Sequence, residues 1–184
     1  MTGGASQSVH KRIDVFLQPG EYCVGGAAHR IRTVLGSCVS VTLWDPASRV
    51  GAMSHFLLAT RGARSKRVDD VRGLDLLALD ARYGDEALRL MLHDLALRKV
   101  APTACRAKIF GGGNMFPHDH AGGAAAIGRR NGEAARGLLQ EHGIEIESES
   151  LFGDGHRQIV FDIASGDVWA RQLPPADAIV GTSA

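Results

Sequence analysis

The chain contains few cysteines, and their spacing argues against two common kinds of site. Its 184 residues include only Cys23, Cys38 and Cys105. An odd and sparse set of this kind is a poor framework for disulfides. There is also no CxxC pair, so a zinc site built on thiolates is not expected. We therefore expect free thiols, no bound metal and no cofactor.

Long apolar runs and an excess of charge of one sign are also lacking. No stretch approaches the roughly 20 apolar residues that span a bilayer, and residues 1–17 hold no apolar run of signal-peptide length. The 21 Lys and Arg residues are balanced by 20 Asp and Glu, which leaves a net charge of +1. This balance gives no reason to expect a nucleic-acid or membrane partner. A cytoplasmic location is the expectation.

The chain does have the length and composition of one globular domain. Hydrophobic residues make up 45% and charged residues 22% of it, as in ordinary soluble domains. There is no internal repeat and no linker. We predict a single mixed α/β domain over residues 13–173, with β-sheets flanked by helices. Residues 1–12 are predicted to be a disordered lead-in and residues 174–184 a flexible tail.

Hydrophobic periodicity predicts the elements of this domain. Helices are expected at 85–99, with Leu88, Met91, Leu92 and Leu95 as the buried stripe, and at 130–140, extending to about 142 and stopping at Gly143. Strands are expected at 14–17, 31–34, 38–44, 51–58, 107–110, 144–149, 158–162 and 168–173. The long segment 59–82 is expected to be partly mobile.

The strands at 38–44 and 51–58 read as a hairpin that carries Cys38 and His55. In an antiparallel pair, opposite residues have numbers with a constant sum. If Trp44 pairs with Gly51 the sum is 95, and if it pairs with Arg49 the sum is 93. Both odd sums place Cys38 and His55 on the same face, because side chains alternate along a strand. Either register lets the imidazole approach the thiol.

A cysteine beside a histidine is the pairing that nucleophilic thiol chemistry requires. A free thiol is mostly protonated at neutral pH, and an imidazole can take its proton. The imidazole needs an orienting group on its other nitrogen, for which Thr33 is the nearby candidate. The turn at Gly36 and Ser37 can aim backbone N–H groups, including that of Cys38, at a developing oxyanion. The alternative is that Cys38 is an inert small hydrophobe, Thr33 a β-former and His55 a satisfied core residue.

Other motifs give weaker signals. Residues 117–120, Pro-His-Asp-His, resemble a metal-binding run but have no further ligands close in sequence, so a solvated loop is favoured. Residues 111–114, Gly-Gly-Gly-Asn, lack the pattern of a phosphate-binding loop, and we expect a backbone turn packed near the active site. Cys23 and Cys105 lack a histidine on any expected shared face and are interpreted as structural. The basic residues Arg61, Arg64, Lys66 and Arg67 belong either to a solvated loop or to a surface that contacts acidic helices.

Several blocks of sequence, taken in order, resemble the CheD family of chemoreceptor glutamine deamidases. They are residues 33–39 (TVLGSCV) with 43–45 (LWD), 51–58 (GAMSHFLL), 82–85 (RYGD), 108–116 (KIFGGGNMF), 127–131 (IGRRN), 157–162 (RQIVFD) and 166–169 (GDVW). They span roughly residues 13–173. No single block is decisive, but the ordered set, with a cysteine and a histidine at family-like separation, is highly specific.

The resemblance implies a fold similar to CheD and to the cysteine hydrolase domain of deamidating toxins. It implies a protein-glutamine glutaminase with Cys38 as nucleophile, His55 as base and Thr33 as orienting residue. The implied substrates are glutamines on the cytoplasmic helices of methyl-accepting chemoreceptors, in bacterial chemotaxis. A CheC-type phosphatase is a further implied partner. The alternatives are a cysteine amidohydrolase with another substrate and a non-catalytic adaptor that binds receptors or the phosphatase.

Overall fold

The structure is a computed structural model that describes residues 11–61, 76–115 and 123–174, and all statements below concern those residues. Their strands form two sheets. The four-stranded sheet has the order β1 (Ile13–Phe16), β3 (His29–Leu35), β8 (His156–Asp162) and β9 (Asp167–Leu173). The five-stranded sheet has the order β2 (Tyr22–Gly26), β5 (Val50–Ser54), β4 (Val39–Asp45), β6 (Arg106–Gly111) and β7 (Glu145–Leu151). Both sheets are mixed, because β1–β3 and β6–β7 pair in parallel and the other pairs are antiparallel.

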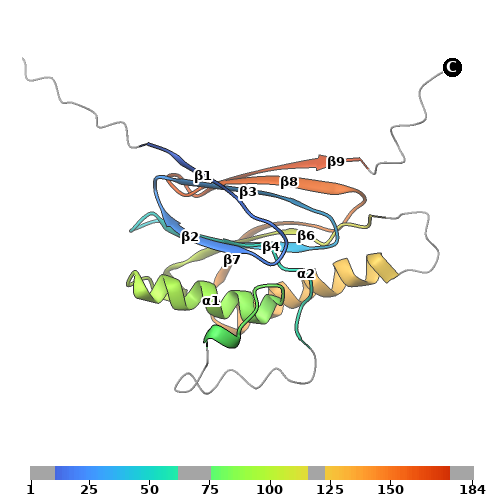
Figure 1. Cartoon of the computed structure of the whole chain (residues 1–184), viewed down its shortest axis with the longest axis horizontal. Helices are drawn as coiled ribbons and strands as arrows, with labels where there is room; N and C mark the ends of the chain where they lie inside the picture. The colour runs from blue at the N-terminus through green and yellow to red at the C-terminus, as the bar shows by residue number, and fades with distance from the viewer. Residues whose placement is uncertain (1–10, 62–75, 116–122, 175–184) are drawn as a thin grey trace, which may run out of the picture.

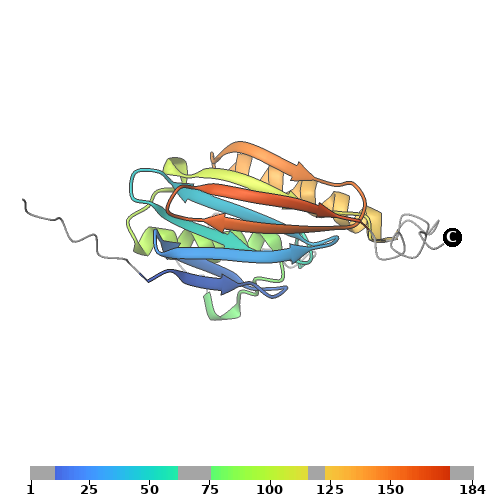
Figure 2. The same cartoon turned by 90° about the horizontal axis from the view of Figure 1, so that it is seen from above.

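The molecule has three layers. The four-stranded sheet packs on one face of the five-stranded sheet, and two helices, α1 (Gly84–Leu97) and α2 (Gly123–Glu141), cover the other face (Figure 1). Short 3₁₀ helices, η1 (Leu76–Ala78) and η2 (Pro102–Ala104), precede α1 and β6. Seen from above, the four-stranded sheet lies over the five-stranded one with the helices behind (Figure 2). No described helix covers the outer face of the four-stranded sheet, so the described helices flank the five-stranded sheet only.

Two hydrophobic clusters separate the layers. One fills the space between the sheets and includes Ile31, Met53, Phe110 and Phe161. The other lies between the five-stranded sheet and the helices, where Val39, Val41 and Leu43 of β4 meet the buried stripe of α1. The five-stranded sheet is therefore covered on both faces, and this explains why β4 is buried almost throughout.

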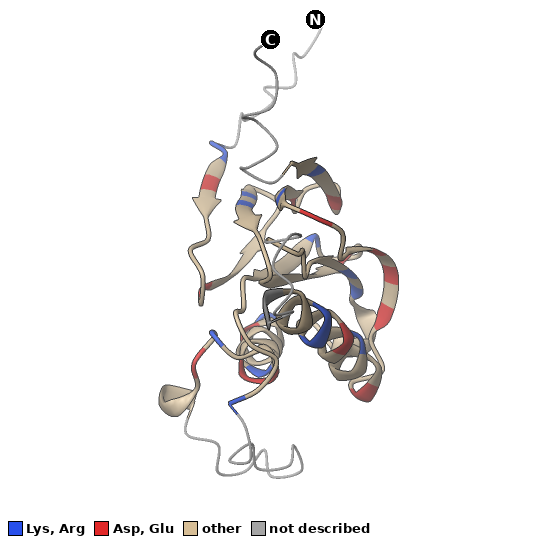
Figure 3. Ribbon diagram, turned by 90° about the vertical axis from the view of Figure 1, so that its right-hand side faces the viewer, with Lys and Arg blue, Asp and Glu red and all other residues tan. Residues whose placement is uncertain are grey.

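Charged residues lie mainly outside these clusters. Viewed along the long axis, both blue and red bands occur on the ribbons of the helices, and blue bands also lie on the strands (Figure 3). Within the described residues, no helix is both long and apolar enough to cross a bilayer.

The hairpin has the first of the two expected registers, that with sum 95, since Trp44 pairs with Gly51 and Thr42 with Met53. Three of the element predictions need correction. The ladder of β5 ends at Ser54 instead of residue 58. Helix α2 begins at Gly123, seven residues before the predicted start, because the alanines at 124–126 are strong helix formers between glycines that suggested a loop. The strand β2 was not predicted, because its Gly25-Gly26 end reads as a turn.

The strands and helices begin at Ile13 and end at Leu173. The division into a lead-in at 1–12, a domain at 13–173 and a tail at 174–184 remains a prediction, since residues 1–10 and 175–184 lie outside the described part of the chain.

Candidate active site

Cys38 lies in a tight turn between β3 and β4, and its thiol is partly exposed. Three consecutive carbonyls of this turn accept hydrogen bonds from outside it. Gly113 N–H donates to the Gly36 carbonyl and Gly112 N–H to the Cys38 carbonyl, each at 2.8 Å. The side-chain amide of Asn131 donates to the Ser37 carbonyl at 3.2 Å. The turn is therefore held through its carbonyls. In each trans peptide unit the N–H points in the direction opposite to the carbonyl.

The glycine run at 111–114 packs against this turn, as expected from the sequence. Gly111 has φ of +111°, and a Cβ built there would lie 2.2 Å from the Cys38 carbonyl oxygen. A Cβ on Gly36 would lie 2.6 Å from the Met115 sulfur. A larger residue at Gly111 would force the two turns apart, because the atoms it would meet are backbone, so glycine there allows the close approach that places Cys38. At Gly36 the neighbour is a flexible methionine side chain, which can move aside.

The buried guanidinium of Arg157 (β8) supports the same region from the four-stranded sheet. It donates to the carbonyls of Gly111 at 3.1 Å and Phe152 at 3.0 Å. Burial lowers the pKa of Arg157, and among the described residues no carboxylate lies within ion-pair distance of it. A fork with several N–H donors can hold two carbonyls at once, which a lysine cannot do in the same planar geometry.

His55 lies directly after β5, where the chain leaves the ladder. Its N–H donates to the Glu21 carbonyl at 2.9 Å, and its carbonyl accepts from Gly20 N–H at 2.7 Å. The segment leading into β2 therefore fixes the backbone of His55. Since β2 was not predicted, this support could not be expected from the sequence.

The imidazole of His55 points between the sheets. Its Nδ1 lies 2.8 Å from the Thr33 hydroxyl, although Thr33 belongs to β3 in the opposite sheet. The Thr33 hydroxyl also donates to the Leu17 carbonyl at 2.8 Å. A hydroxyl has one hydrogen, so it must accept from Nδ1–H of the histidine. Nε2 is then the unprotonated nitrogen, with its lone pair available.

Cys38 and His55 lie on the same face, as the hairpin argument predicted. Val39 pairs with Phe56 in an isolated bridge that continues the register of sum 95. Cys38 is therefore a diagonal neighbour of His55, at the strand spacing of roughly 7–8 Å between such positions. The thiol packs with the inter-sheet cluster, in the layer that the imidazole enters.

Burial keeps both groups uncharged. Burial raises the pKa of the Cys38 thiol, and its own backbone N–H offsets part of this effect. Burial lowers the pKa of His55 to about 4, against smaller raising effects from the Leu17 carbonyl and the Glu21 charge. His55 Nε2 is buried and has no hydrogen-bond partner among the described residues. A neutral thiol on the same face as a free imidazole lone pair can transfer its proton when a carbonyl carbon approaches.

One sequence interpretation needs correction. Cys23 was expected to share no face with a histidine, but β2 pairs with β5 so that Cys23 lies opposite Met53. It therefore lies on the inter-sheet face, diagonal to the next position on that face, His55. Cys105 is buried near the Ala101 carbonyl and packs in the helix-side cluster, as a structural residue would.

Of the run that resembles a metal-binding motif and the basic segment, the structure describes only Arg61. The Pro-His-Asp-His run at 117–120 lies outside the described residues, as do Arg64, Lys66 and Arg67. The described part of the chain holds no group of three or more His, Cys, Asp or Glu side chains able to bind a metal ion. Arg61 is described, and its guanidinium is held by Glu86 at 2.7 and 2.9 Å and lies 5.0 Å from the centre of the Tyr83 ring.

Comparison with known proteins identifies the family. The family model for CheD chemotactic sensory transduction matches residues 75–172. A probable chemoreceptor glutamine deamidase CheD 2 of Albidiferax ferrireducens is 60% identical over 165 residues, which cover 90% of each chain. A probable chemoreceptor glutamine deamidase CheD 3 of Dechloromonas aromatica is 42% identical, covering 90% of this chain and 91% of the relative.

A third relative and one solved structure extend the comparison. The probable chemoreceptor glutamine deamidase CheD of Pseudomonas savastanoi pv. phaseolicola is 36% identical, covering 88% of this chain and 85% of the relative. The hypothetical protein YfiH of Bacillus licheniformis superposes with a TM-score of 0.38 at 18% identity, covering 71% of this chain and 50% of that one. That score is too low to establish a common fold. The match to the family model and the identity to these relatives agree, and both show that this chain belongs to the CheD family.

Proposed function

We propose that this protein is a protein-glutamine glutaminase that converts glutamine side chains of chemoreceptors to glutamate, as the names of its relatives indicate. In this proposal Cys38 is the nucleophile, His55 the general base and Thr33 the residue that orients the imidazole. The observation that carries the assignment is the Thr33 hydrogen bond, which leaves the Nε2 lone pair of His55 free on the face that holds Cys38.

The reaction begins with a neutral pair. As Sγ of Cys38 bonds to the carboxamide carbon, Nε2 of His55 takes the thiol proton and the carbonyl π electrons move onto oxygen. When the tetrahedral intermediate collapses, the C–N bond breaks and nitrogen leaves with its electron pair. It takes the proton from Nε2 and departs as ammonia, which leaves a thioester on Cys38.

Hydrolysis returns the enzyme to its starting state. Water attacks the thioester carbon while Nε2 of His55 takes one of its protons. The second tetrahedral intermediate collapses by breaking the C–S bond, and the proton on Nε2 returns to sulfur. The products are glutamate and the free thiol, so each cycle consumes one water and releases one ammonia.

The turn at Gly36 and Ser37 supplies the donors for both oxyanions. No acceptor among the described residues takes the N–H of Ser37 or that of Cys38. Backbone donors fixed in advance at the position of a developing oxyanion contribute most of the rate enhancement in many acyl transfers.

The substrates are glutamines on chemoreceptor helices, and we place the protein in the cytoplasm with them. A CheC-type phosphatase is a second proposed partner, for which co-elution with the purified phosphatase is the test. Arg61 is committed to Glu86 within the fold. Any contact of the basic segment with acidic receptor helices therefore rests on Arg64, Lys66 and Arg67.

The test is mass spectrometry of a receptor cytoplasmic fragment after incubation with the protein. Wild type should raise the fragment mass by about one dalton per modified glutamine, with an equal yield of ammonia, as amide-to-acid exchange requires. Cys38→Ala should abolish both signals, and Cys23→Ala, the matched change of a second thiol on the same face, should retain them. Receptor binding without any change of mass in wild type would instead support the non-catalytic adaptor.

A further inference from the structure

Among the described side chains, Asn131 on α2 is the one that hydrogen-bonds both to the turn that holds Cys38 and to the segment that follows His55. Its amide nitrogen donates to the Ser37 carbonyl at 3.2 Å and to the Leu57 carbonyl at 2.7 Å. Ser37 precedes Cys38, and Leu57 follows His55 by two residues. A primary amide has two N–H donors, so both bonds form together and fix which end of the amide is nitrogen.

The position of Asn131 makes these bonds consequential. The residue is completely buried. Its helix, α2, belongs to the layer that covers the five-stranded sheet (Figure 1). Its Oδ1 has no hydrogen-bond partner among the described residues. A buried acceptor without a partner costs free energy, so the orientation of the amide is set by the two carbonyls that its nitrogen holds.

The bond to Ser37 also fixes the N–H of Cys38, because these groups belong to one peptide unit. A trans peptide is planar, and its carbonyl and its N–H point in opposite directions. The structure has no cis peptide bond among its described residues. Holding the Ser37 carbonyl toward α2 therefore turns the Cys38 N–H away from α2.

The peptide before this one is fixed in the same manner by a different donor. Gly113 N–H holds the Gly36 carbonyl, which turns the Ser37 N–H away from the glycine run. The backbone thus supplies the support for one of the two donors. As far as the structure describes the chain, only the Ser37–Cys38 peptide of this turn is held by a side chain.

We propose that Asn131 is a positioning residue that holds the Ser37–Cys38 peptide so that the Cys38 N–H stabilises the oxyanion. This inference rests on the proposed deamidase function. Asn131 acts through the peptide and touches neither the substrate nor the reacting sulfur. Its loss should therefore affect steps that form an oxyanion far more than steps that only need the thiol.

The first test compares two reactions of Cys38 in wild type, Asn131→Ala and Asn131→Asp. Removing the support of one oxyanion donor should lower kcat for receptor deamidation by about 10²–10³-fold with KM little changed. The second reaction is disulfide exchange with methyl methanethiosulfonate, which forms no oxyanion. Its rate at Cys38, resolved from Cys23 by peptide mass spectrometry, should stay within about threefold of wild type, because it depends on the thiolate alone.

Asn131→Asp sharpens the comparison because it keeps the size of the side chain and replaces the donor by an acceptor. It should lose as much kcat as Asn131→Ala. The control for general damage to α2 is Ala135→Gly, one turn further along on the buried face, which loosens the helix without touching the turn. It should keep wild-type kcat at a temperature where circular dichroism shows both variants folded.

The outcomes separate the two proposals. Retained kcat in Asn131→Asp, or an equal loss of kcat and of thiol exchange, would overturn the role of Asn131. If wild type releases no ammonia, the deamidase proposal fails, and a glutamine analogue with an aldehyde in place of the carboxamide still decides the matter. The aldehyde forms a hemithioacetal with Cys38, whose equilibrium constant ¹³C NMR measures. That constant should be about 10²-fold lower in Asn131→Ala than in wild type if Asn131 supports the oxyanion donor, and the same if it does not.

Discussion

At the scale of single residues, one hydroxyl decides which nitrogen of the imidazole carries the proton. Thr33 donates to the Leu17 carbonyl and so can only accept from His55 Nδ1. The basic lone pair is thereby assigned to Nε2 by a hydroxyl, and no described carboxylate hydrogen-bonds to the ring. A hydroxyl orients the ring but adds no negative charge, so the imidazole keeps a low proton affinity in its buried site.

Replacing Thr33 tests this assignment. Thr33→Val keeps the shape but removes the hydroxyl, and it should lower kcat about 10- to 100-fold, as expected for a lost hydrogen bond worth about 1–3 kcal/mol. Thr33→Ser keeps the hydroxyl and should retain most of the activity. Steady-state kinetics on a receptor fragment gives the answer, and equal kcat in the valine and serine variants would contradict it.

The low pKa of His55 predicts the pH dependence of the reaction. The base must be neutral, so kcat/KM should fall only as pH drops below about 5, toward the His55 pKa of about 4. An ordinary histidine would give a limb near pH 6.5. A limb centred near 6.5 in the measured profile would show that His55 is not the buried neutral base.

The same pKa affects stability with a definite sign. The pKa of His55 is lower in the folded state than the ordinary value of 6.5, so the unfolded state binds a proton first. The free energy of unfolding should therefore decline as pH falls from about 6.5 toward 4. His55→Gln should weaken this decline in urea titrations at a series of pH values, and an unchanged decline would point to other groups.

At the scale of elements, the site is built where segments distant in sequence meet. Arg157 from β8 holds carbonyls of the β6 and β7 ends. Arg157→Met would leave the Phe152 carbonyl without a donor and the Gly111 carbonyl with only the Phe152 N–H, and it should cost about 1–3 kcal/mol of stability. Hydrogen exchange at Gly112 and Gly113 should quicken with it. Arg171→Met on the exposed side of β9 is the matched control, and an equal effect there would refute the bracing role.

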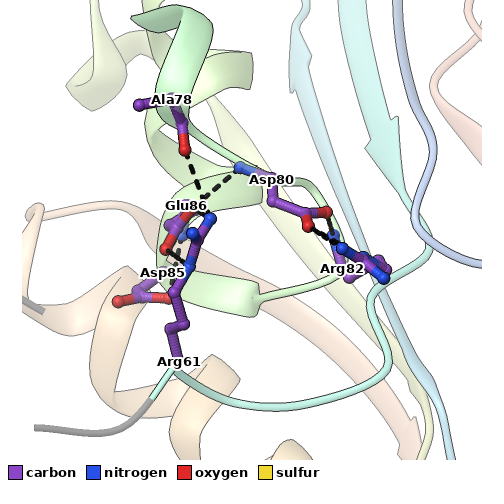
Figure 4. A network of polar contacts seen from close by, with 6 residues as sticks. All are labelled: Arg61, Ala78, Asp80, Arg82, Asp85 and Glu86. Atoms are coloured by element: carbon purple, nitrogen blue, oxygen red, sulfur yellow. Dashed lines mark hydrogen bonds and ion pairs between the residues drawn. The ribbon is translucent and has the colours of Figure 1, made fainter. Parts of the chain in front are cut away.

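Glu86 does similar work at the start of α1. Its carboxylate accepts from the Arg61 guanidinium and from Asp80 N–H, and Arg61 also reaches the Ala78 carbonyl (Figure 4). These bonds join the segment that ends at Arg61 to the segment that begins at residue 76. The acidic residue also lies in the first helical turn, where negative charge is favourable.

Substituting Glu86 should therefore loosen this junction. Glu86→Gln removes the charge and should lower the free energy of unfolding by about 1–3 kcal/mol, since a hydrogen bond to a charged group is lost in a mostly buried place. The exposed Glu133→Gln on α2 should change it by less than about 0.5 kcal/mol. Urea unfolding of both variants measures the difference, which should vanish if Glu86 is merely a surface charge.

At the scale of the whole molecule, the local sequence pattern predicts the hairpin that carries Cys38 and His55, but it does not predict the residues that surround and support this hairpin. Alternation along 38–44 gave the face of Cys38, and a parity argument gave the face of His55. The contact between Thr33 and His55 joins two sheets, and no periodicity within one strand reports on sheet packing. The supports at Leu17, Glu21, Asn131 and Arg157 were missed for the same reason. The only sequence signal for Asn131 was its place in the block 127–131.

The covalent intermediate gives the most direct test of the account. A receptor fragment mixed with the protein and quenched in acid during turnover should carry a thioester on the Cys38 peptide. Its mass should equal that of the two peptides less one ammonia, as expected for a thiol route. No such adduct should appear on Cys23. Glutamate formed at the wild-type rate by Cys38→Ala, or an adduct on another residue, would contradict the central claim.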